Sequence, residues 1–269
     1  MLSNKLSLLI LTCQKYSDLW EGHIAMLNAN WQYRDIKTIV STDSNDDKRQ
    51  FEGISIVEAG KNSEFSDRIK TALECISTDY IFITLDDYFL LEQVNTRRIE
   101  NLVDAMKNYQ IDYLRLSKLP NSNKLLDKSL NLYKINLEDR KSNYYVNLYP
   151  GIWERKFLEK TLKFSLNAWQ YEVSLTPIAC DAKAICVMSK SIDYKILDVV
   201  RKGKILRAAN KYFLKNPVYT GNRVIMHRSE EWRIIIRTLA KRILPRPVFL
   251  FIKKEMIKRK YNFYSPLDI

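Results

Sequence analysis

The chain has 269 residues, of which 46% are hydrophobic, and it carries a formal net charge of +13 at pH 7. This length permits one large α/β domain with an appended region, and the apolar content is enough for a sizeable core. No run of about 18 apolar residues occurs, which predicts no transmembrane helix, and the short first apolar run favours a core strand over a signal peptide.

The spacing of the cysteines indicates their redox state. The four cysteines, at positions 13, 75, 180 and 186, show no CxxC spacing. This favours reduced thiols in a cytosolic setting over a disulfide framework or a zinc site.

The positive charge is concentrated in the C-terminal region. Residues 201–269 hold 18 Lys and Arg against 4 Asp and Glu, a net of +14, so residues 1–200 carry a net of −1. A basic C-terminal region predicts an anionic partner there, whether phospholipid, nucleic acid or a pyrophosphate.

Strand-like and helix-like segments alternate in the first half of the chain. Strands are predicted over 5–11, 35–41, 54–59, 80–85 and 111–117, and helices over 16–29, 63–76 and 96–108. Further on, the pattern predicts a loop at 120–131, a strand at 144–150, a helix at 154–164 and a strand at 184–188. The segment 167–179 is predicted to be helical until Pro177. The βαβ rhythm predicts a mainly parallel central sheet flanked by helices, in which ligands bind beyond the carboxyl ends of the strands.

Two adjacent carboxylates, Asp86 and Asp87, follow the predicted strand YIFITL directly. Desolvating a carboxylate costs several kcal/mol unless a cation or donors compensate, so the pair is expected to face a cleft, a metal or a ligand. Carboxylate oxygens hold Mg²⁺ or Mn²⁺, and such an ion bridges phosphate oxygens of a nucleotide. The GxxxxGK[ST] and GxGxxG signatures are absent. The alternative is that both acids serve only as turn residues.

Three segments resemble the GT-A glycosyltransferases, particularly the family 2-like enzymes of bacterial capsular and surface-polysaccharide biosynthesis: LSLLILTCQKYSDLW, FSDRIKTALECISTDYIFITLDDYFLL and NAWQYEVS. The resemblance implies a GT-A-like catalytic domain over 1–195, with a nucleotide-binding half at 1–117 and an acceptor half at 118–195. Residues 196–269 then form a basic, partly amphipathic helical extension. The chain departs from the family pattern at Tyr88, where a further acid is usual, and this leaves metal dependence open.

The resemblance assigns roles in binding the donor. It implies that Thr12 and Asp43 contact the base or ribose of a nucleotide-sugar, with a UDP-sugar favoured, and that Arg68 lies near the pyrophosphate. Asp86 and Asp87 would reach the ribose, the metal or both. Mn²⁺ or Mg²⁺ is the implied cofactor, with Asp87 and His227 as candidate ligands. A solvated Arg68, an ordinary surface or packing His227 and an Asp43 that is simply a loop acid are the competing interpretations.

On the acceptor side, the resemblance implies that Glu172 is the general base, deprotonating an acceptor hydroxyl with inversion at the anomeric carbon. Asp181 and Glu154 are rival bases, and retaining enzymes share the same nucleotide-binding half. Trp169 and Tyr171 would offer aromatic faces to a sugar, although such residues more often pack in a core. His23 receives no role.

The C-terminal region has an amphipathic pattern. Its apolar face comprises Trp232, Ile235, Ile236, Leu239 and Ile243, with a cationic rim. This predicts binding to an anionic membrane surface through residues 232–260, or packing of the same face on the catalytic domain. No nucleic acid is expected, because the aromatics are not interleaved with basic residues.

The predicted function is sugar transfer from a nucleotide-sugar to a polyprenyl-diphosphate-linked oligosaccharide at the inner face of the cell membrane. A nucleotidyltransferase of similar fold is the alternative enzyme, but its glycine- and basic-rich loop after the first strand is absent. The other alternative is a non-enzymatic basic protein that binds membranes or nucleic acid.

Overall fold

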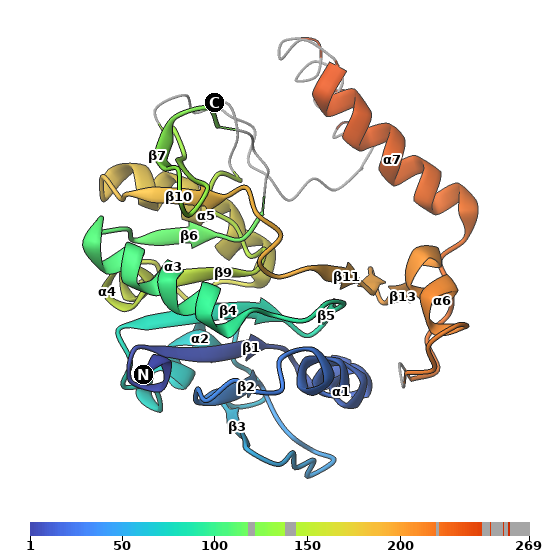
Figure 1. Cartoon of the computed structure of the whole chain (residues 1–269). Helices are drawn as coiled ribbons and strands as arrows, with labels where there is room; N and C mark the ends of the chain where they lie inside the picture. Colours follow the sequence, from blue (N-terminus) through green and yellow to red (C-terminus); the bar gives the residue numbers. More distant parts are fainter. Residues whose placement is uncertain are drawn as a thin grey trace. The chain divides into compact units, whose positions relative to one another are not determined.

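The computed structural model describes residues 1–117, 122–137, 144–218 and 221–243, together with the single residues 248, 255 and 258. The chain divides into two compact units (Figure 1). The first comprises Met1–Leu197, and the second comprises Asp198–Val218 and the residues from Asn222 on.

A nine-stranded sheet forms the centre of the first unit, in the order β3-β2-β1-β4-β9-β6-β10-β8-β7 (Figure 1). Its strands are β1 (Leu6–Leu11), β2 (Thr38–Thr42), β3 (Ile54–Glu58), β4 (Tyr80–Leu85), β6 (Tyr113–Arg115), β7 (Leu125–Asp127), β8 (Leu132–Lys134), β9 (Gly151–Glu154) and β10 (Cys186–Ser189). Pairs β1–β2, β2–β3, β1–β4 and β6–β10 are parallel, whereas β9 runs antiparallel to both β4 and β6. Strand β8 is likewise antiparallel to β10 and β7. Among the described strands, only β9 and β8 therefore run against the others in this mostly parallel sheet, and the predicted α/β fold class is confirmed.

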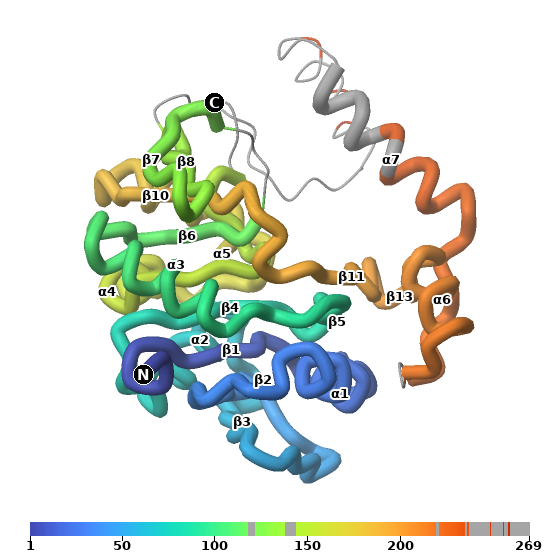
Figure 2. The backbone as a smooth tube through the Cα atoms, viewed as in Figure 1, coloured from blue at the N-terminus to red at the C-terminus, as the bar shows by residue number. Residues whose placement is uncertain are grey.

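Helices cover both faces of this sheet (Figure 2). They are α1 (Trp20–Asn30), α2 (Phe65–Glu74), α3 (Thr96–Asn108), α4 (Arg155–Lys160) and α5 (Ala168–Asp181), with 3₁₀ turns η1 (Leu2–Asn4) and η2 (Gln14–Leu19). One core cluster joins β1 to α1 and α3, and the other joins β1 to α2, α4 and α5. Leu8 belongs to the first cluster and Leu9 to the second, because successive side chains point to opposite faces of a strand.

Two elements of the first unit have the bounds that the sequence predicts, β4 and α3, and three predictions are wrong in detail. Within the described residues, the predicted loop 120–131 contains strand β7, which pairs with β8. Residues 144–150 form an irregular segment, and the strand follows at β9, because amides of this segment bond to side chains of α5 instead of to a neighbouring strand. Helix α5 continues past Pro177 to Asp181, and core packing of Ala179 accompanies its last turn.

A short strand, β5 (Tyr88–Leu90), leaves the carboxyl end of β4 and pairs with β11 (Ile196–Asp198). The amide of Leu91 donates to the carbonyl of Lys195 at 2.9 Å, which extends this pairing. The turn that holds Asp86 and Asp87 thus lies between two strands and is fixed at both ends.

The described part of the second unit contains a small hairpin and two helices. Its elements are β12 (Val200–Arg201), β13 (Lys204–Ile205), α6 (Arg207–Phe213) and α7 (Arg228–Ile243). Glu230 at the start of α7 forms an ion pair with Lys204 at 2.8 Å, and Glu231 accepts from the amide of Arg207 at 2.7 Å. No helix in the described part of the chain is both long and apolar enough to span a bilayer.

Helix α3 is attached to the sheet by a buried ion pair. Arg98 Nε lies 2.9 Å from Asp193 Oδ1, and the Asp193 side chain is only 3% exposed. Arg98 also donates to the carbonyl of Leu130 at 2.6 Å. We expect Asp193→Ala to lower the free energy of unfolding by about 3 kcal/mol, because it leaves a largely buried guanidinium without its carboxylate. Urea denaturation measures the change.

The matched control is Lys61→Ala, which removes the exposed ion pair between Lys61 and Asp46. Such surface pairs contribute about 0–1 kcal/mol, so this variant should unfold almost as the wild type does. Equal effects of the two substitutions would contradict a stabilising role for the Arg98–Asp193 pair.

Candidate functional site

The carboxyl ends of β1, β2 and β4 meet at one edge of the sheet. Strands β2 and β3 lie on one side of β1 and β4 lies on the other, so the strand order reverses direction between β1 and β4. Crevices at such switch points are where open α/β sheets bind ligands. Thr12, Asp43 and Asp86 each follow one of these strands directly.

Asp86 is held at this edge by its neighbours. The hydroxyl of Thr12 donates to Asp86 Oδ2, and the indole Nε1 of Trp20 donates to Thr12 Oγ1 at 2.7 Å. The amide of Asp86 donates to the carbonyl of Leu11 at 3.2 Å. Asp86 is 7% exposed, so these bonds stabilise a carboxylate that solvent barely reaches.

Asp43 joins the segment after β1 to the end of β2. Its Oδ1 accepts from the amide of Gln14 at 2.6 Å and from the amide of Ser44 at 2.9 Å. This carboxylate therefore fixes the loop that begins at Thr12. Its predicted contact with a base or ribose stays a prediction.

Arg68, on α2, brings a positive charge to the same edge. The guanidinium lies 5.7 Å from the centre of the Phe65 ring, and its charge and that of Asp86 both act on the thiol of Cys13. Burial raises the pKa of Cys13, the carboxylates of Asp86 and Asp43 raise it further, and Arg68 opposes them. The fold thus gathers Thr12, Asp43, Arg68 and Asp86 around one point.

Tyr88, which follows Asp87, and Glu172 both contact the same irregular segment, residues 144–150. Tyr88, next to Asp87, has its ring 5.8 Å from that of Tyr149. The amide of Leu148 donates to Glu172 Oε1 at 3.3 Å. This segment leads into β9, whose first residue, Gly151, pairs with Ile83 near the carboxyl end of β4. Both carboxylates therefore lie on the carboxyl side of the sheet.

Glu172 has the electrostatic character of a proton acceptor. Burial raises the pKa of its carboxyl, and the hydrogen bond from Leu148 partly offsets that rise. A base is most effective when its pKa approaches the operating pH, so this direction favours proton abstraction.

The two rival bases occupy unsuitable positions. Glu154 pairs with Tyr80 at the amino end of β4, on the opposite edge of the sheet from Asp86, and caps α4 by accepting from Phe157 at 2.7 Å. Asp181 is exposed at the last residue of α5.

The remaining predicted residues differ in exposure. Trp169 is 56% exposed, three residues before Glu172 on α5. Tyr171 is fully buried against Phe65 and its hydroxyl lies 2.6 Å from that of Thr161, which is the environment of a packing residue. His227 belongs to the second unit, where its Nδ1 lies 2.8 Å from Ser229 Oγ.

The carboxylates at the end of β4 fit a Mg²⁺ ion that takes most of its ligands from phosphate and water. Among the described residues, no group of three or more His, Cys, Asp and Glu side chains is placed to hold a metal by itself. Mg²⁺ is commonly held by one or two carboxylates, with phosphate oxygens and water completing its shell. Asp87, half-buried beside the engaged Asp86, fits that mode of binding.

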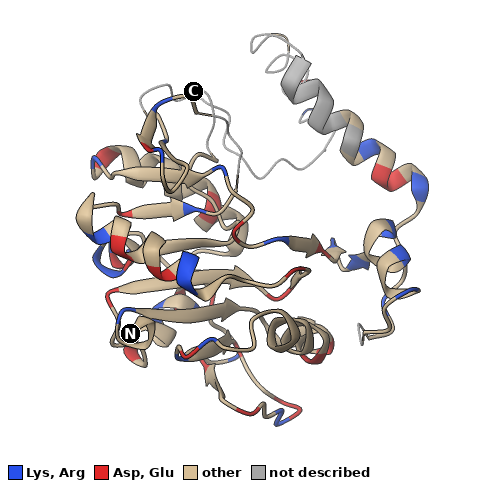
Figure 3. Cartoon of the chain, in the orientation of Figure 1, with Lys and Arg blue, Asp and Glu red and all other residues tan. Residues whose placement is uncertain are grey.

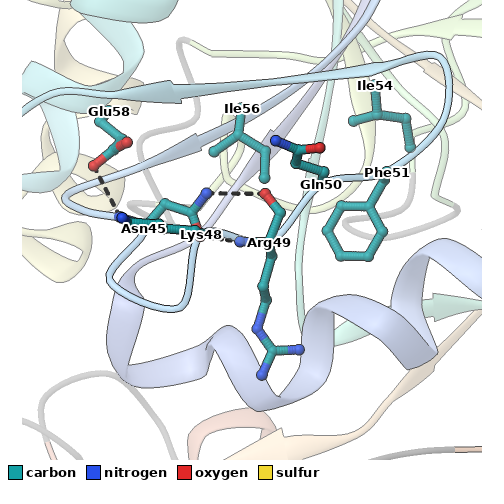
Figure 4. Close-up of a pocket in the computed structure, with 8 residues that line it drawn as sticks. All are labelled: Asn45, Lys48, Arg49, Gln50, Phe51, Ile54, Ile56 and Glu58. Atoms are coloured by element: carbon teal, nitrogen blue, oxygen red, sulfur yellow. Dashed lines mark hydrogen bonds between the residues drawn. The ribbon is translucent and has the colours of Figure 1, made fainter.

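A separate pocket of about 520 Å³ lies at the edge strand β3 (Figure 4). Phe51, Ile54 and Ile56 line it together with polar residues of the preceding loop. Asn45 shapes that loop: its amide donates to Glu58 at 2.9 Å and its side chain bonds to the main chain of Arg49. None of the predicted site residues lines this pocket.

Neither a family model nor a curated protein sequence matches the chain. Among solved structures, it is similar to S. aureus TarS at 13% identity, with a TM-score of 0.48, over 71% of this chain and 36% of that one. It therefore spans about a third of the length of TarS.

Two further structures are similar to it. The mannosyltransferase PcManGT from Pyrobaculum calidifontis, solved with GDP-Man and Mn²⁺, has 13% identity and a TM-score of 0.48 over 97% of this chain and 81% of that one. Bifunctional IspDF from Campylobacter jejuni has 17% identity and a TM-score of 0.44 over 72% and 52%.

The sequence pattern did not identify Trp20, His23 and Arg115 as residues that contact the site or its neighbouring segments. Trp20 and His23 lie three apart on α1, where their spacing shows only an apolar helix face. Arg115 ends β6 and donates to the carbonyls of Tyr144 and Tyr145 at 3.4 and 3.3 Å. No spacing in the sequence links Arg115 to those carbonyls, because the two segments meet only in the folded sheet.

His23 is an almost completely buried titratable group beside the site, at 1% exposure. Burial lowers its pKa to about 4, so the folded chain keeps it neutral. In the unfolded chain a histidine takes up a proton below about pH 6.5. Stability should therefore fall as the pH drops from about 6.5 to about 4, by on the order of 3 kcal/mol, and this loss should level off below.

The measurement compares urea unfolding of the wild type and His23→Phe at pH 7 and pH 4.5. The variant cannot bind the proton in either state, so it should gain stability relative to the wild type at the lower pH. A difference between the two proteins that does not change with pH would show that His23 titrates alike in the folded and unfolded chains.

Proposed function

We propose that the chain is a glycosyltransferase that moves a sugar from a nucleotide-sugar to an acceptor hydroxyl, with inversion at the anomeric carbon. The observation that carries this proposal is that one loop segment, residues 144–150, contacts both Glu172 and the neighbour of Asp87: Tyr88 packs on Tyr149, and Leu148 donates to Glu172. A carboxylate that can hold a diphosphate-bound ion and a separate, partly desolvated base are the two groups that such a transfer needs.

The donor half of the reaction is assigned to the sheet edge. Thr12 and Asp43, fixed by short hydrogen bonds, border the space for the nucleoside, and Arg68 supplies a positive charge for the diphosphate. Asp87, with Asp86 behind it, would hold Mg²⁺ or Mn²⁺, which when bound neutralises charge on the leaving diphosphate. A UDP-sugar is the proposed donor.

The acceptor half is assigned to α5 and the segment 144–150. Glu172 would accept the proton of the attacking acceptor hydroxyl. Direct attack of that hydroxyl on the anomeric carbon, from the face opposite the diphosphate, gives inversion. Trp169, exposed on the same helix, offers an aromatic face to the C–H surface of a sugar.

Two substitutions should separate binding from transfer. We expect Asp87→Asn to abolish metal-dependent nucleotide binding, because a neutral amide cannot hold the ion. Glu172→Gln should leave nucleotide binding unchanged and lower the transfer rate by about 10²–10⁴-fold, the usual contribution of a general base. Calorimetric titration of UDP, GDP and CDP with and without Mn²⁺ measures the first effect, and release of nucleoside diphosphate from a nucleotide-sugar measures the second.

Asp181→Asn is the matched control on α5, since its side chain is exposed at the far end of the helix. It should behave as the wild type in both assays. If the folded wild-type protein binds none of these nucleotides, the transferase proposal is wrong. Pyrophosphate release from a nucleoside triphosphate and a sugar phosphate would instead identify a nucleotidyltransferase.

We further propose that the second unit attaches the chain to an anionic membrane, beside a polyprenyl-diphosphate-linked acceptor. Basic residues recur along this unit (Figure 3), and the described part of α7 exposes Trp232 and Ile236 at 61% and 58%. Apolar side chains with a cationic rim are the features of a helix that lies in the membrane interface. The side chains of Ile235, Leu239 and Ile243, and most of residues 244–260, lie outside the described residues.

Neutralising two exposed cations of α7 tests the membrane proposal. Each basic residue near an anionic leaflet contributes about 1 kcal/mol, so Arg228→Gln with Arg233→Gln should lower partitioning into phosphatidylglycerol vesicles by about 30-fold. Vesicle flotation at low and high salt measures it, and binding should weaken as salt rises. The control pair Lys156→Gln with Lys160→Gln removes two exposed charges from α4 in the first unit. Equal loss in both pairs would mean that only net charge matters.

A further inference from the structure

We propose that His23 is a positioning residue for the turn that carries Asp86 and Asp87. In the complex with a nucleotide and its metal ion, a ring N–H of His23 donates to the main-chain carbonyl of Asp86 and fixes the direction of the Asp87 side chain. This inference rests on the proposed function, since it concerns the same site.

Neither nitrogen of His23 makes a well-aligned hydrogen bond, although the ring is almost completely buried. The main chain of Asp86 lies beside the ring and acts on it as a poorly aligned hydrogen-bond partner. The enclosed space around the ring is lined by Ile10, Val40 and Asp86, among others, and does not admit a water molecule. Solvent therefore cannot supply the missing partner.

Helix α1 holds Asp86 from one side through two residues. Trp20 and His23 lie three residues apart and so share one face of the helix. Trp20 acts on the carboxylate of Asp86 through Thr12, whereas His23 faces the main chain of the same residue. The ring of Phe89, on β5, meets the His23 ring edge to face with centroids 5.7 Å apart and limits its rotation.

An unpaired polar group in a dry core destabilises a fold, and replacing it by an apolar group of the same shape is neutral or stabilising. If His23 served packing alone, an apolar ring would perform at least as well. Its nitrogens are useful only if a partner comes within reach, and the Asp86 carbonyl is beside them. A small closure of the turn around a bound ion would complete that bond.

The test compares His23→Phe, His23→Asn and His23→Gln with the wild type, using calorimetric titration of UDP, GDP and CDP with Mg²⁺ and thermal unfolding without ligand. Phe keeps the ring but removes both nitrogens, so it should unfold at the same or a higher temperature and bind nucleotide–Mg²⁺ about 10-fold more weakly, as loss of a residue supporting a metal ligand does. Asn or Gln, whose amide replaces one ring nitrogen, should recover part of the affinity. Met26→Leu, another buried position of α1, is the control.

A measurement on the wild-type chain does not depend on how the variants fold. The chain has only two histidines, so ¹⁵N-histidine spectra resolve His23 once His227→Gln identifies the other. Adding the nucleotide that binds, with Mg²⁺, should shift one ring nitrogen of His23 to a hydrogen-bonded position. An unshifted His23 signal, or unchanged affinity in His23→Phe, overturns this inference alone. Failure of the wild type to bind any of the nucleotides overturns the proposed function and this inference with it.

Discussion

A carboxylate at the end of a buried strand needs hydrogen-bond donors, and the candidate site is organised around that requirement. Asp86 is almost inaccessible to solvent and is stabilised by the hydroxyl of Thr12, which is itself oriented by the indole of Trp20. These three residues come from the end of β4, the end of β1 and the start of α1. Because desolvation of an unpaired carboxylate is so costly, the bonds that satisfy Asp86 also fix the relative positions of these elements.

Asp87, the second carboxylate of the pair, is the one to which the proposed function assigns the metal ion. Asp87 is half-buried and is followed by Tyr88, whose ring packs on Tyr149. Tyr88 thus joins the turn to the segment 144–150. Because Leu148 of that segment also bonds to Glu172, the segment contacts both halves of the candidate site.

Packing and site support overlap in this region. The apolar clusters hold the sheet and its helices together, and they include Trp20 and Leu148, which bond to Thr12 and Glu172 of the site. His23 is buried beside the site with no well-aligned hydrogen bond to either nitrogen, which apolar packing alone does not require. Polar groups kept unpaired in a core require a reason, and proximity to Asp86 provides one.

The sequence by itself determined the fold class, the bounds of β4 and α3, and the position of the Asp86–Asp87 pair after a core strand, because periodicity and strand ends are local properties of the chain. Only the tertiary structure decided that Asp86 is buried and bonded to Thr12 while Asp87 is half-buried, that Tyr171 packs in the core, and that Glu154 lies at the opposite edge of the sheet. It also replaced the predicted strand at 144–150 by an irregular segment. These outcomes depend on which distant segments meet across the sheet, and neither residue type nor spacing encodes such pairings directly.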